Sequence, residues 1–265
     1  MIPKRVATIA GSDTTGGAGM LADLKIFEDY DVFGLVALTC IVALNKKDEW
    51  APSIHPISLS LLEEQLNTVI HAEPSVIKTG MIPTSEQIEL VAKVLTPLNI
   101  PLVVDPVMAC KRGDETQLED IKMTIKQKLL PLATIATPNL IEASLLTKID
   151  IHSIEDMKQA AQIIVESLHC QAVVIKGGTR LGTEEAVDVF YDGKQWAILK
   201  EKVISPSYNH GAGCTFAAAI TAGIAQGLPL LEAVVKAKDV VTCAIKHSFK
   251  INDEISHIYH HSYFK

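Results

Sequence analysis

Short apolar runs alternate with amphipathic segments along most of this chain. The apolar runs are rich in β-branched residues, as buried strands are, and they fall at residues 6–10, 34–44, 76–78, 102–104, 134–136 and 172–175. Between them, apolar side chains recur every three or four residues, which predicts helices such as 59–72, 154–168 and one opened by a Thr84-x-x-Gln87 capping box. This alternation predicts an α/β fold with a mainly parallel sheet and helices on both faces.

The last third of the chain adds two further signals. Residues 187–191 and 195–199 flank Asp192-Gly193, which predicts a β-hairpin, and Pro229 opens a closing helix. Two polar segments, 45–50 and 111–119, have loop character and are candidate lids over an open sheet edge. Because no repeat or interdomain linker interrupts the pattern, we expect residues 1–265 to form a single domain.

Polar residues follow several predicted strands. Asp13 lies in a loop with four glycines between residues 11 and 19, Asp105 ends one strand, and Lys176 ends another. Open α/β sheets bind ligands beyond the carboxyl ends of their strands, so one sheet edge could collect these side chains. Asn139 and Glu142, three apart at a helix start, could serve a hydrated magnesium ion or cap the helix, and both interpretations stay open.

The stretch from Asn209 to Thr215 contains Gly211-Ala212-Gly213-Cys214 and leads into an apolar helix of small residues. A glycine turn before a helix leaves amide N–H groups pointing outward with partial positive charge, which suits a phosphate. The same field would favour the thiolate of Cys214. Taken alone, however, the glycines could serve packing only.

Composition excludes some classes of function. A net charge of −7 leaves no basic excess for nucleic-acid binding. Five scattered cysteines without a Cys-x-x-Cys pair disfavour a disulfide framework or a zinc site and fit a reducing cytoplasm. No apolar run approaches membrane-spanning length, so we expect a cytoplasmic protein without a membrane partner.

With these motifs in view, the chain resembles the ribokinase-like superfamily, and within it the branch of hydroxymethylpyrimidine kinases and similar bacterial pyridoxal kinases. Six motifs carry the resemblance in order: Ala10-Gly11-Ser12-Asp13 with Gly16-Gly17-Ala18-Gly19, Lys78-Thr79-Gly80-Met81, Asp105-Pro106-Val107-Met108, Thr137-Pro138-Asn139 with Glu142, Lys176-Gly177-Gly178, and Gly211-Ala212-Gly213-Cys214. The resemblance implies a three-layer α/β sandwich with a small lid. It also implies a kinase that uses ATP and Mg²⁺ to phosphorylate a hydroxymethyl group on a small heteroaromatic ring, and leaves a monovalent cation open as a further cofactor.

The same resemblance implies roles for individual residues. Those expected around the substrate are Gly11, Asp13, Gly19, Leu44, Gly80, Met81, Val107 and His210. Those expected to hold the nucleotide are Asn139, Glu142, Lys176, Gly177, Gly178, Gly211, Ala212 and Gly213, with Asp105 and Glu142 organising magnesium. Gly211 and Gly213 would also form the anion hole for the transfer. Cys214 would be the base for the substrate hydroxyl, and the alternative is that it only shapes the pocket.

Two departures bear on the substrate. Hydroxymethylpyrimidine kinases typically read Ala-Gln-Asn where this chain has Ala43-Leu44-Asn45, and leucine cannot supply the hydrogen bonds of that glutamine. Cys110 follows the Asp105 motif, where the similar pyridoxal kinases with two active-site cysteines have one that adds reversibly to the substrate aldehyde. A buried apolar role is the alternative for Cys110.

Leu44 and Cys110 together favour a pyridoxal kinase that makes pyridoxal 5'-phosphate. A hydroxymethylpyrimidine or phosphomethylpyrimidine kinase of thiamine synthesis is the alternative, and one enzyme could have both activities. A protein that binds the vitamers without catalysis is a third hypothesis, which the intact phosphate and metal motifs disfavour. The resemblance also implies a homodimer, since members of that branch commonly form one.

Overall fold

The protein forms one large sheet whose centre is parallel and whose edges are antiparallel. The computed structural model describes residues 2–108, 115–182, 184–205 and 208–265. In the order β3-β2-β1-β4-β5-β6-β7-β8-β9, the pairs from β2 to β7 are parallel and the outer pairs β2–β3, β7–β8 and β8–β9 are antiparallel. The strands are β1 (Lys4–Asp13), β2 (Val32–Asn45), β3 (Ala51–Pro56), β4 (Val76–Thr79), β5 (Leu102–Val104), β6 (Ile135–Ala136), β7 (Val173–Gly178), β8 (Glu185–Tyr191) and β9 (Trp196–Lys202).

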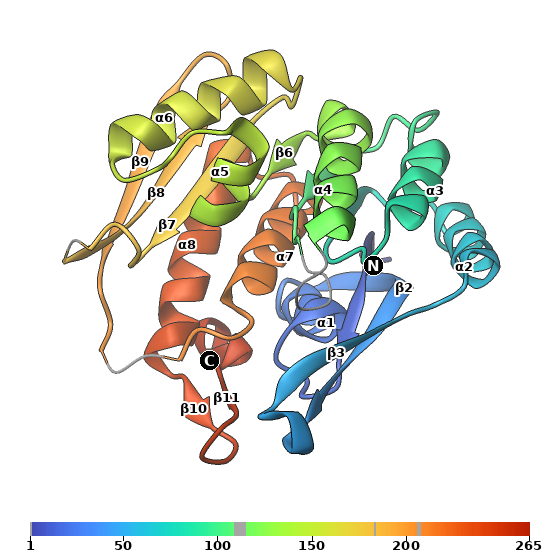
Figure 1. Ribbon diagram of the computed structural model, residues 1–265, viewed down its shortest axis with the longest axis horizontal. Helices are drawn as coiled ribbons and strands as arrows, with labels where there is room; N and C mark the ends of the chain where they lie inside the picture. The colour runs from blue at the N-terminus through green and yellow to red at the C-terminus, as the bar shows by residue number, and fades with distance from the viewer. Residues whose placement is uncertain (1, 109–114, 183, 206–207) are drawn as a thin grey trace.

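Helices cover both faces of this sheet (Figure 1). They are α1 (Gly19–Asp29), α2 (Leu59–His71), α3 (Ser85–Leu95), α4 (Glu115–Thr124), α5 (Leu140–Thr147), α6 (Ile154–Gln162), α7 (Ala212–Ala225) and α8 (Leu230–Lys246), with π-helical turns extending α4 over Ile125–Leu129 and α6 over Ile163–Ser167. The predicted three-layer α/β sandwich is confirmed.

Two separate cores lie on the two faces, because neighbouring side chains of a strand point in opposite directions. Val104 packs with α2 to α6 on one face, whereas Val103 packs with α1, α7 and α8 on the other. On the second face, α7 is built almost entirely of small buried residues, which lets it lie close beneath the strands. Its N-terminus lies at the carboxyl edge of the parallel strands, where Gly19 N donates to Cys214 Sγ and a Cβ at Gly213 would lie 3.4 Å from Lys176 Nζ.

Two local expectations need correction, and one strand was not predicted. The polar segment 111–119 is not all loop, because α4 already begins at Glu115. β3 lacks a sequence signal of its own and pairs antiparallel with β2. The capping box at Thr84 is only half formed: the hydroxyl accepts from Gln87 N at 3.2 Å, but the Gln87 amide turns inward and donates to the backbone oxygens of Thr39 and Ile57.

The hairpin is confirmed as β8 and β9, whose register pairs Tyr191 with Trp196. Beyond α8, the short strands β10 (Phe249–Lys250) and β11 (Ser256–His257) and a 3-10 turn at His260–Phe264 return the chain towards α1, an arrangement that the sequence does not predict. Within the described ranges, no helix combines the length and apolarity that a membrane crossing requires.

Candidate active site

The polar ends of the parallel strands meet the first turn of α7 at one sheet edge. Asp105 follows β5 and its amide donates to the carbonyl of Thr79 at 3.0 Å, while Asn139 and Lys176 form an isolated parallel bridge after β6 and within β7. α7 begins beside them, with Gly211 as its N-cap. The predicted convergence of strand-end side chains is thus present.

A cavity of about 480 Å³ lies on the β1, β2 and β4 side of this edge. Every residue expected around the substrate lines it: Gly11, Asp13, Gly19, Leu44, Gly80, Met81, Val107 and His210. Cys214 lines the same cavity from α7. Its mixture of apolar walls and a few polar groups is typical of a small-molecule site.

Asp13 and His210 form the polar pair of this cavity. His210 Nε2 lies 2.8 Å from Asp13 Oδ2, and Thr15 donates to the same carboxylate from its backbone N and its hydroxyl. Burial alone would raise the pKa of Asp13, but the hydrogen bonds from His210 and Thr15 outweigh it and lower the pKa below its usual value. Asp13 is therefore a fixed carboxylate that orients His210.

A second cavity of about 470 Å³ lies on the β7, β8 and α8 side. It is lined by Asn139, Lys176, Gly177, Gly178, Gly211, Ala212 and Gly213, that is, by the expected nucleotide residues other than Glu142. His210 lines both cavities, so the two spaces meet at the first turn of α7. Outward-facing amides at this helix start would lie between two bound ligands.

Gly211 must be glycine for two reasons. Its φ of 90° is in the left-handed region, and a Cβ at this position would lie 1.9 Å from the carbonyl oxygen of Gly17. The contact locks the loop of β1 against the start of α7. The glycine-rich loop and the Gly-Ala-Gly-Cys stretch are consequently two halves of one structure.

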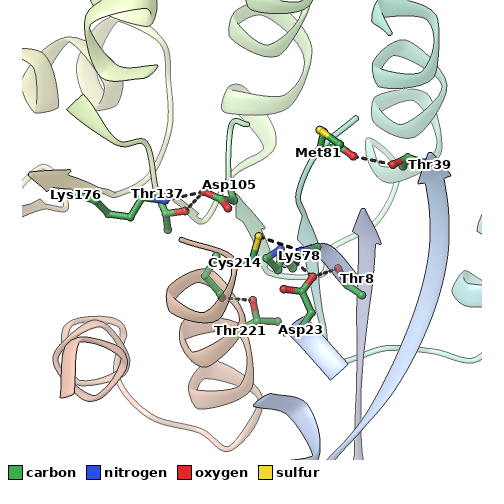
Figure 2. Close-up of polar contacts among 12 residues, drawn as sticks. Thr8, Asp23, Thr39, Lys78, Met81, Asp105, Thr137, Lys176, Cys214 and Thr221 are labelled. Atoms are coloured by element: carbon green, nitrogen blue, oxygen red, sulfur yellow. Dashed lines mark hydrogen bonds and ion pairs between the residues drawn. The ribbon is translucent and has the colours of Figure 1, made fainter. Parts of the chain in front are cut away.

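Lys176 and Asp105 form an ion pair at this junction. Lys176 Nζ lies 2.9 Å from Asp105 Oδ1, which also accepts from Thr137 at 2.9 Å. A Cβ added at Gly213 would lie 3.4 Å from the same ammonium. The positive charge of Lys176 is therefore held against the first turn of α7, where it can meet a phosphate (Figure 2).

Asn139 and Glu142 form the complete capping box of α5. Glu142 N donates to the Asn139 side chain at 3.0 Å, and the Glu142 carboxylate accepts from Asn139 N at 2.8 Å. Burial raises the pKa of Glu142 to about 7, Lys176 opposes this, and the charge of Asp105 adds to it. Asn139 and Glu142 therefore cap α5, and the carboxylates of Glu142 and Asp105 repel each other.

This pair fits a hydrated magnesium ion. The residues that the structure describes contain no cluster of three His, Cys, Asp or Glu side chains for a metal, but magnesium often uses one or two carboxylates and keeps its waters. A divalent cation would relieve the repulsion between Asp105 and Glu142, which adds to the effect of burial on the pKa of Glu142. The metal site itself stays a prediction.

Cys214 differs from its expected charge state. Its Sγ accepts from Gly19 N at 3.3 Å, yet burial raises the pKa of the thiol to about 11, with Lys78 opposing and Asp23 and Asp105 adding to the increase. The expected lowering is wrong for the free protein, because burial outweighs the stabilising effects of Lys78 and of the Gly19 amide on the thiolate. The thiol is protonated at neutral pH.

Several cavity residues were missed by sequence reasoning. Pro52 enters from the β2–β3 hairpin beside Trp50, the last residue of the predicted lid segment 45–50. Residues 254–257 enter from the C-terminal segment, where the His257 ring lies 5.1 Å from that of His210. Lys78, quoted only as part of a motif, lines the cavity although its side chain is fully buried. Cys110 lies outside the described residues.

Comparison with known proteins identifies the family. A sequence model described as phosphomethylpyrimidine kinase matches residues 13–259. The chain belongs to this family. A relative named as a putative pyridoxine kinase in Staphylococcus epidermidis is 46% identical over 265 residues, which cover 99% of this chain and 95% of the relative.

Solved structures of the family agree with this assignment. An ADP complex of Bacillus subtilis pyridoxal kinase has a TM-score of 0.94 at 42% identity and covers 99% of both chains. Staphylococcus aureus pyridoxal kinase in complex with AMP-PCP and pyridoxal has a TM-score of 0.91 at 44% identity, covering 99% of this chain and 95% of that one. The predicted ribokinase-like fold and branch are confirmed.

Proposed function

We propose that this protein is an ATP-dependent pyridoxal kinase that phosphorylates the 5'-hydroxymethyl group of pyridoxal. The observation that carries the proposal is the meeting of two cavities at the first turn of α7. At position 44, on the wall of the substrate cavity, the chain has a leucine, which cannot hydrogen-bond to a substrate ring. Relatives named as pyridoxine kinases and structures of pyridoxal kinases with nucleotide and pyridoxal support it.

The chemistry follows from this arrangement. The hydroxyl oxygen of the substrate forms a bond to the γ-phosphorus as the bond from that phosphorus to the bridging oxygen of ADP breaks, and the hydroxyl proton passes to Cys214 Sγ in its thiolate form. Phosphoryl transfer depends chiefly on positioning and charge stabilisation. The amides of Gly211 and Gly213 and the ammonium of Lys176 would supply that stabilisation.

The base role of Cys214 is part of the proposal. With a pKa of about 11, only a small fraction of the protein carries the thiolate at neutral pH, and only that fraction could accept the proton of the hydroxyl, so turnover should rise with pH. Magnesium, held through its waters by Asp105 and Glu142, would neutralise the phosphates of ATP. Asn139, Gly177 and Gly178 would complete the nucleotide site.

A panel of pyridoxal, pyridoxine, pyridoxamine and hydroxymethylpyrimidine with Mg-ATP tests the proposal. We expect the highest kcat/KM for a B6 vitamer, measured by ADP release and by mass spectrometry of the product. Binding without phosphorylation of any vitamer would instead favour a non-catalytic binding protein.

The second candidate function is hydroxymethylpyrimidine or phosphomethylpyrimidine kinase activity, alone or together with the first. The match to the phosphomethylpyrimidine kinase family model favours keeping it. In the same panel, a higher kcat/KM for the pyrimidine or its phosphate would establish this function and displace the first.

Cys110 is proposed to add reversibly through its thiol to the aldehyde carbon of pyridoxal. Support comes only from its position after the Asp105 motif. Pyridoxine lacks the aldehyde, so Cys110→Ala should lower turnover of pyridoxal more than turnover of pyridoxine. An equal loss for both vitamers would end the covalent role.

We further propose that residues 1–265 act as a single kinase domain in a cytoplasmic homodimer. The two cores on opposite faces of one sheet support the single domain. The cysteine pattern supports the cytoplasm. Light scattering of the purified protein would test the dimer.

A further inference from the structure

Lys78 and Asp23 form a completely buried ion pair behind the substrate cavity. Lys78 Nζ lies 2.9 Å from Asp23 Oδ2, and both side chains have no exposed surface. Thr8 donates to the same carboxylate oxygen at 2.6 Å, so β1, β4 and α1 each contribute one member (Figure 2). The ammonium is therefore shielded from solvent by the surrounding protein.

Stability is a poor explanation for this pair. Removing two charges from water carries a large desolvation penalty, and well-packed apolar side chains are often as stable or more so. Moreover, Asp23 Oδ1 is buried without a hydrogen-bond partner within the described parts of the chain. An arrangement with an unsatisfied carboxylate oxygen suggests a role for the ammonium itself.

The ammonium lies next to the transfer point. Lys78 and Cys214 line the same cavity, and a Cβ added at Gly80 would lie 3.1 Å from Lys78 Nζ. Lys78 and Cys214 interact electrostatically, and the Lys78 ammonium is paired with Asp23 (Figure 2). The charged groups that interact electrostatically with Cys214 are Lys78, Asp23, Asp105 and Lys176.

We propose that Lys78, held by Asp23, is a positioning residue that stabilises the thiolate of Cys214, the form of the sulfur that can accept the proton. The inference rests on the proposed function, because it assigns the proton of the substrate hydroxyl to that sulfur. Lys78 contacts neither the substrate nor the nucleotide phosphates in this role. It acts through Cys214 alone.

Alkylation of the thiol tests this without ATP or vitamer. Iodoacetamide reacts with thiolate, so the labelling rate of the Cys214 peptide, measured by mass spectrometry between pH 7 and 10, reports the thiolate fraction. In Lys78→Met we expect labelling about tenfold slower at each pH, equivalent to about one pKa unit. In Asp23→Asn, which keeps the ammonium and removes the opposing charge, labelling should be faster.

Opposite effects separate this role from a structural one. A purely structural pair predicts that both variants loosen the site and label faster. Cys243, half-exposed on α8, gives an internal reference rate, and labelling of the buried Cys170 would reveal unfolding. An unchanged or faster Cys214 rate in Lys78→Met, with Cys170 still protected, would overturn the proposal.

A double variant covers the case in which Lys78→Met does not fold. Lys78→Met with Asp23→Asn removes both charges and retains an acceptor for Thr8, and it should label about tenfold slower than Asp23→Asn alone. Equal rates in these two proteins would also overturn the proposal. A changed labelling rate together with no kinase activity on any vitamer would refute the proposed function but not the coupling of charge.

Discussion

Two lysine–aspartate pairs flank the start of α7, and they differ in exposure. Lys176 and Asp105 adjoin the nucleotide cavity, with side chains 16% and 2% exposed. Lys78 and Asp23 adjoin the substrate cavity and are both 0% exposed. The ammonium–carboxylate distance is 2.9 Å in each.

This difference indicates what each pair can do. Lys176 can reach a phosphate from its place against Gly213, and Asp105 can turn to a metal ion, so that pair can exchange partners when ATP arrives. Lys78 is fully buried, so we expect it to stay paired with Asp23. We therefore expect Lys176 and Asp105, the open pair, to bind the nucleotide. We expect Lys78 and Asp23, the sealed pair, to set the charge environment of Cys214.

The largest effect is expected for Cys214→Ala, which tests the role of the thiol beside the sealed pair. Removing a positioned base should lower kcat by about 10²–10⁴-fold, with little change in the KM for ATP. Because the thiol has a pKa of about 11, its thiolate fraction rises about tenfold per pH unit below that value, so the wild-type kcat/KM should rise with pH from 7 to 9. The variant should lose this rise.

Steady-state kinetics across that range would measure both effects. Cys243→Ala, which removes a half-exposed thiol from α8, is the matched control and should keep the wild-type profile. A wild-type kcat in Cys214→Ala would show that the sulfur takes no part in the reaction. The proposed difference in role between the two lysine–aspartate pairs would then also be wrong.

On the open side, Lys176→Met should lower kcat by about 10²–10³-fold, as for the loss of one preorganised charge at a developing anion. Unlike Cys214→Ala, it should also raise the KM for ATP, because the ammonium would contact phosphate in the ground state as well. Lys200→Met removes a lysine from an exposed pair with Glu185 and should leave both parameters unchanged. An unchanged KM for ATP in Lys176→Met would contradict the role of the open pair.

Gly211 connects the two sides, and its substitution should affect both ligands. In Gly211→Ala the new methyl group would collide with the Gly17 carbonyl oxygen, displace the turn and lower kcat/KM about 100-fold for vitamer and ATP alike. Gly227→Ala is a matched control, since Gly227 has the same φ of 90° but nothing within 4 Å of a Cβ. Both variants carry similar backbone strain, so only a difference in activity between them reports the collision.

Sequence reasoning found the site residues whose position follows from strand ends. Asp13, Asp105, Asn139 and Lys176 could be placed together because parallel strands present their carboxyl ends at one edge. It could not recover the pKa of Cys214, since the helix start is visible in the sequence but the burial is not. The spacing of residues reveals the helix start, which favours the thiolate of Cys214, but not the burial that raises its pKa.

Other parts of the site depend on contacts between distant segments. Lys78 looks like the polar end of a short apolar strand, and its partner Asp23 lies on a helix far away in the sequence. Residues 254–257 reach the substrate cavity only because β10 and β11 pair after α8 has ended. No local pattern marks either arrangement.

The smallest expected effect concerns the choice of substrate in the cavity that Leu44 lines. In Leu44→Gln, an amide at the cavity wall could hydrogen-bond an aminopyrimidine, so the kcat/KM ratio of pyridoxal to hydroxymethylpyrimidine should fall about tenfold. Ile41→Gln carries the same amide on the same strand at a side chain that is 43% exposed and should leave the ratio unchanged. Because Leu44 lies apart from both ion pairs, kcat with pyridoxal should change less than the ratio does. Equal losses for the two substrates would mean that Leu44 only shapes the cavity, and that the choice of ring is made elsewhere on its wall.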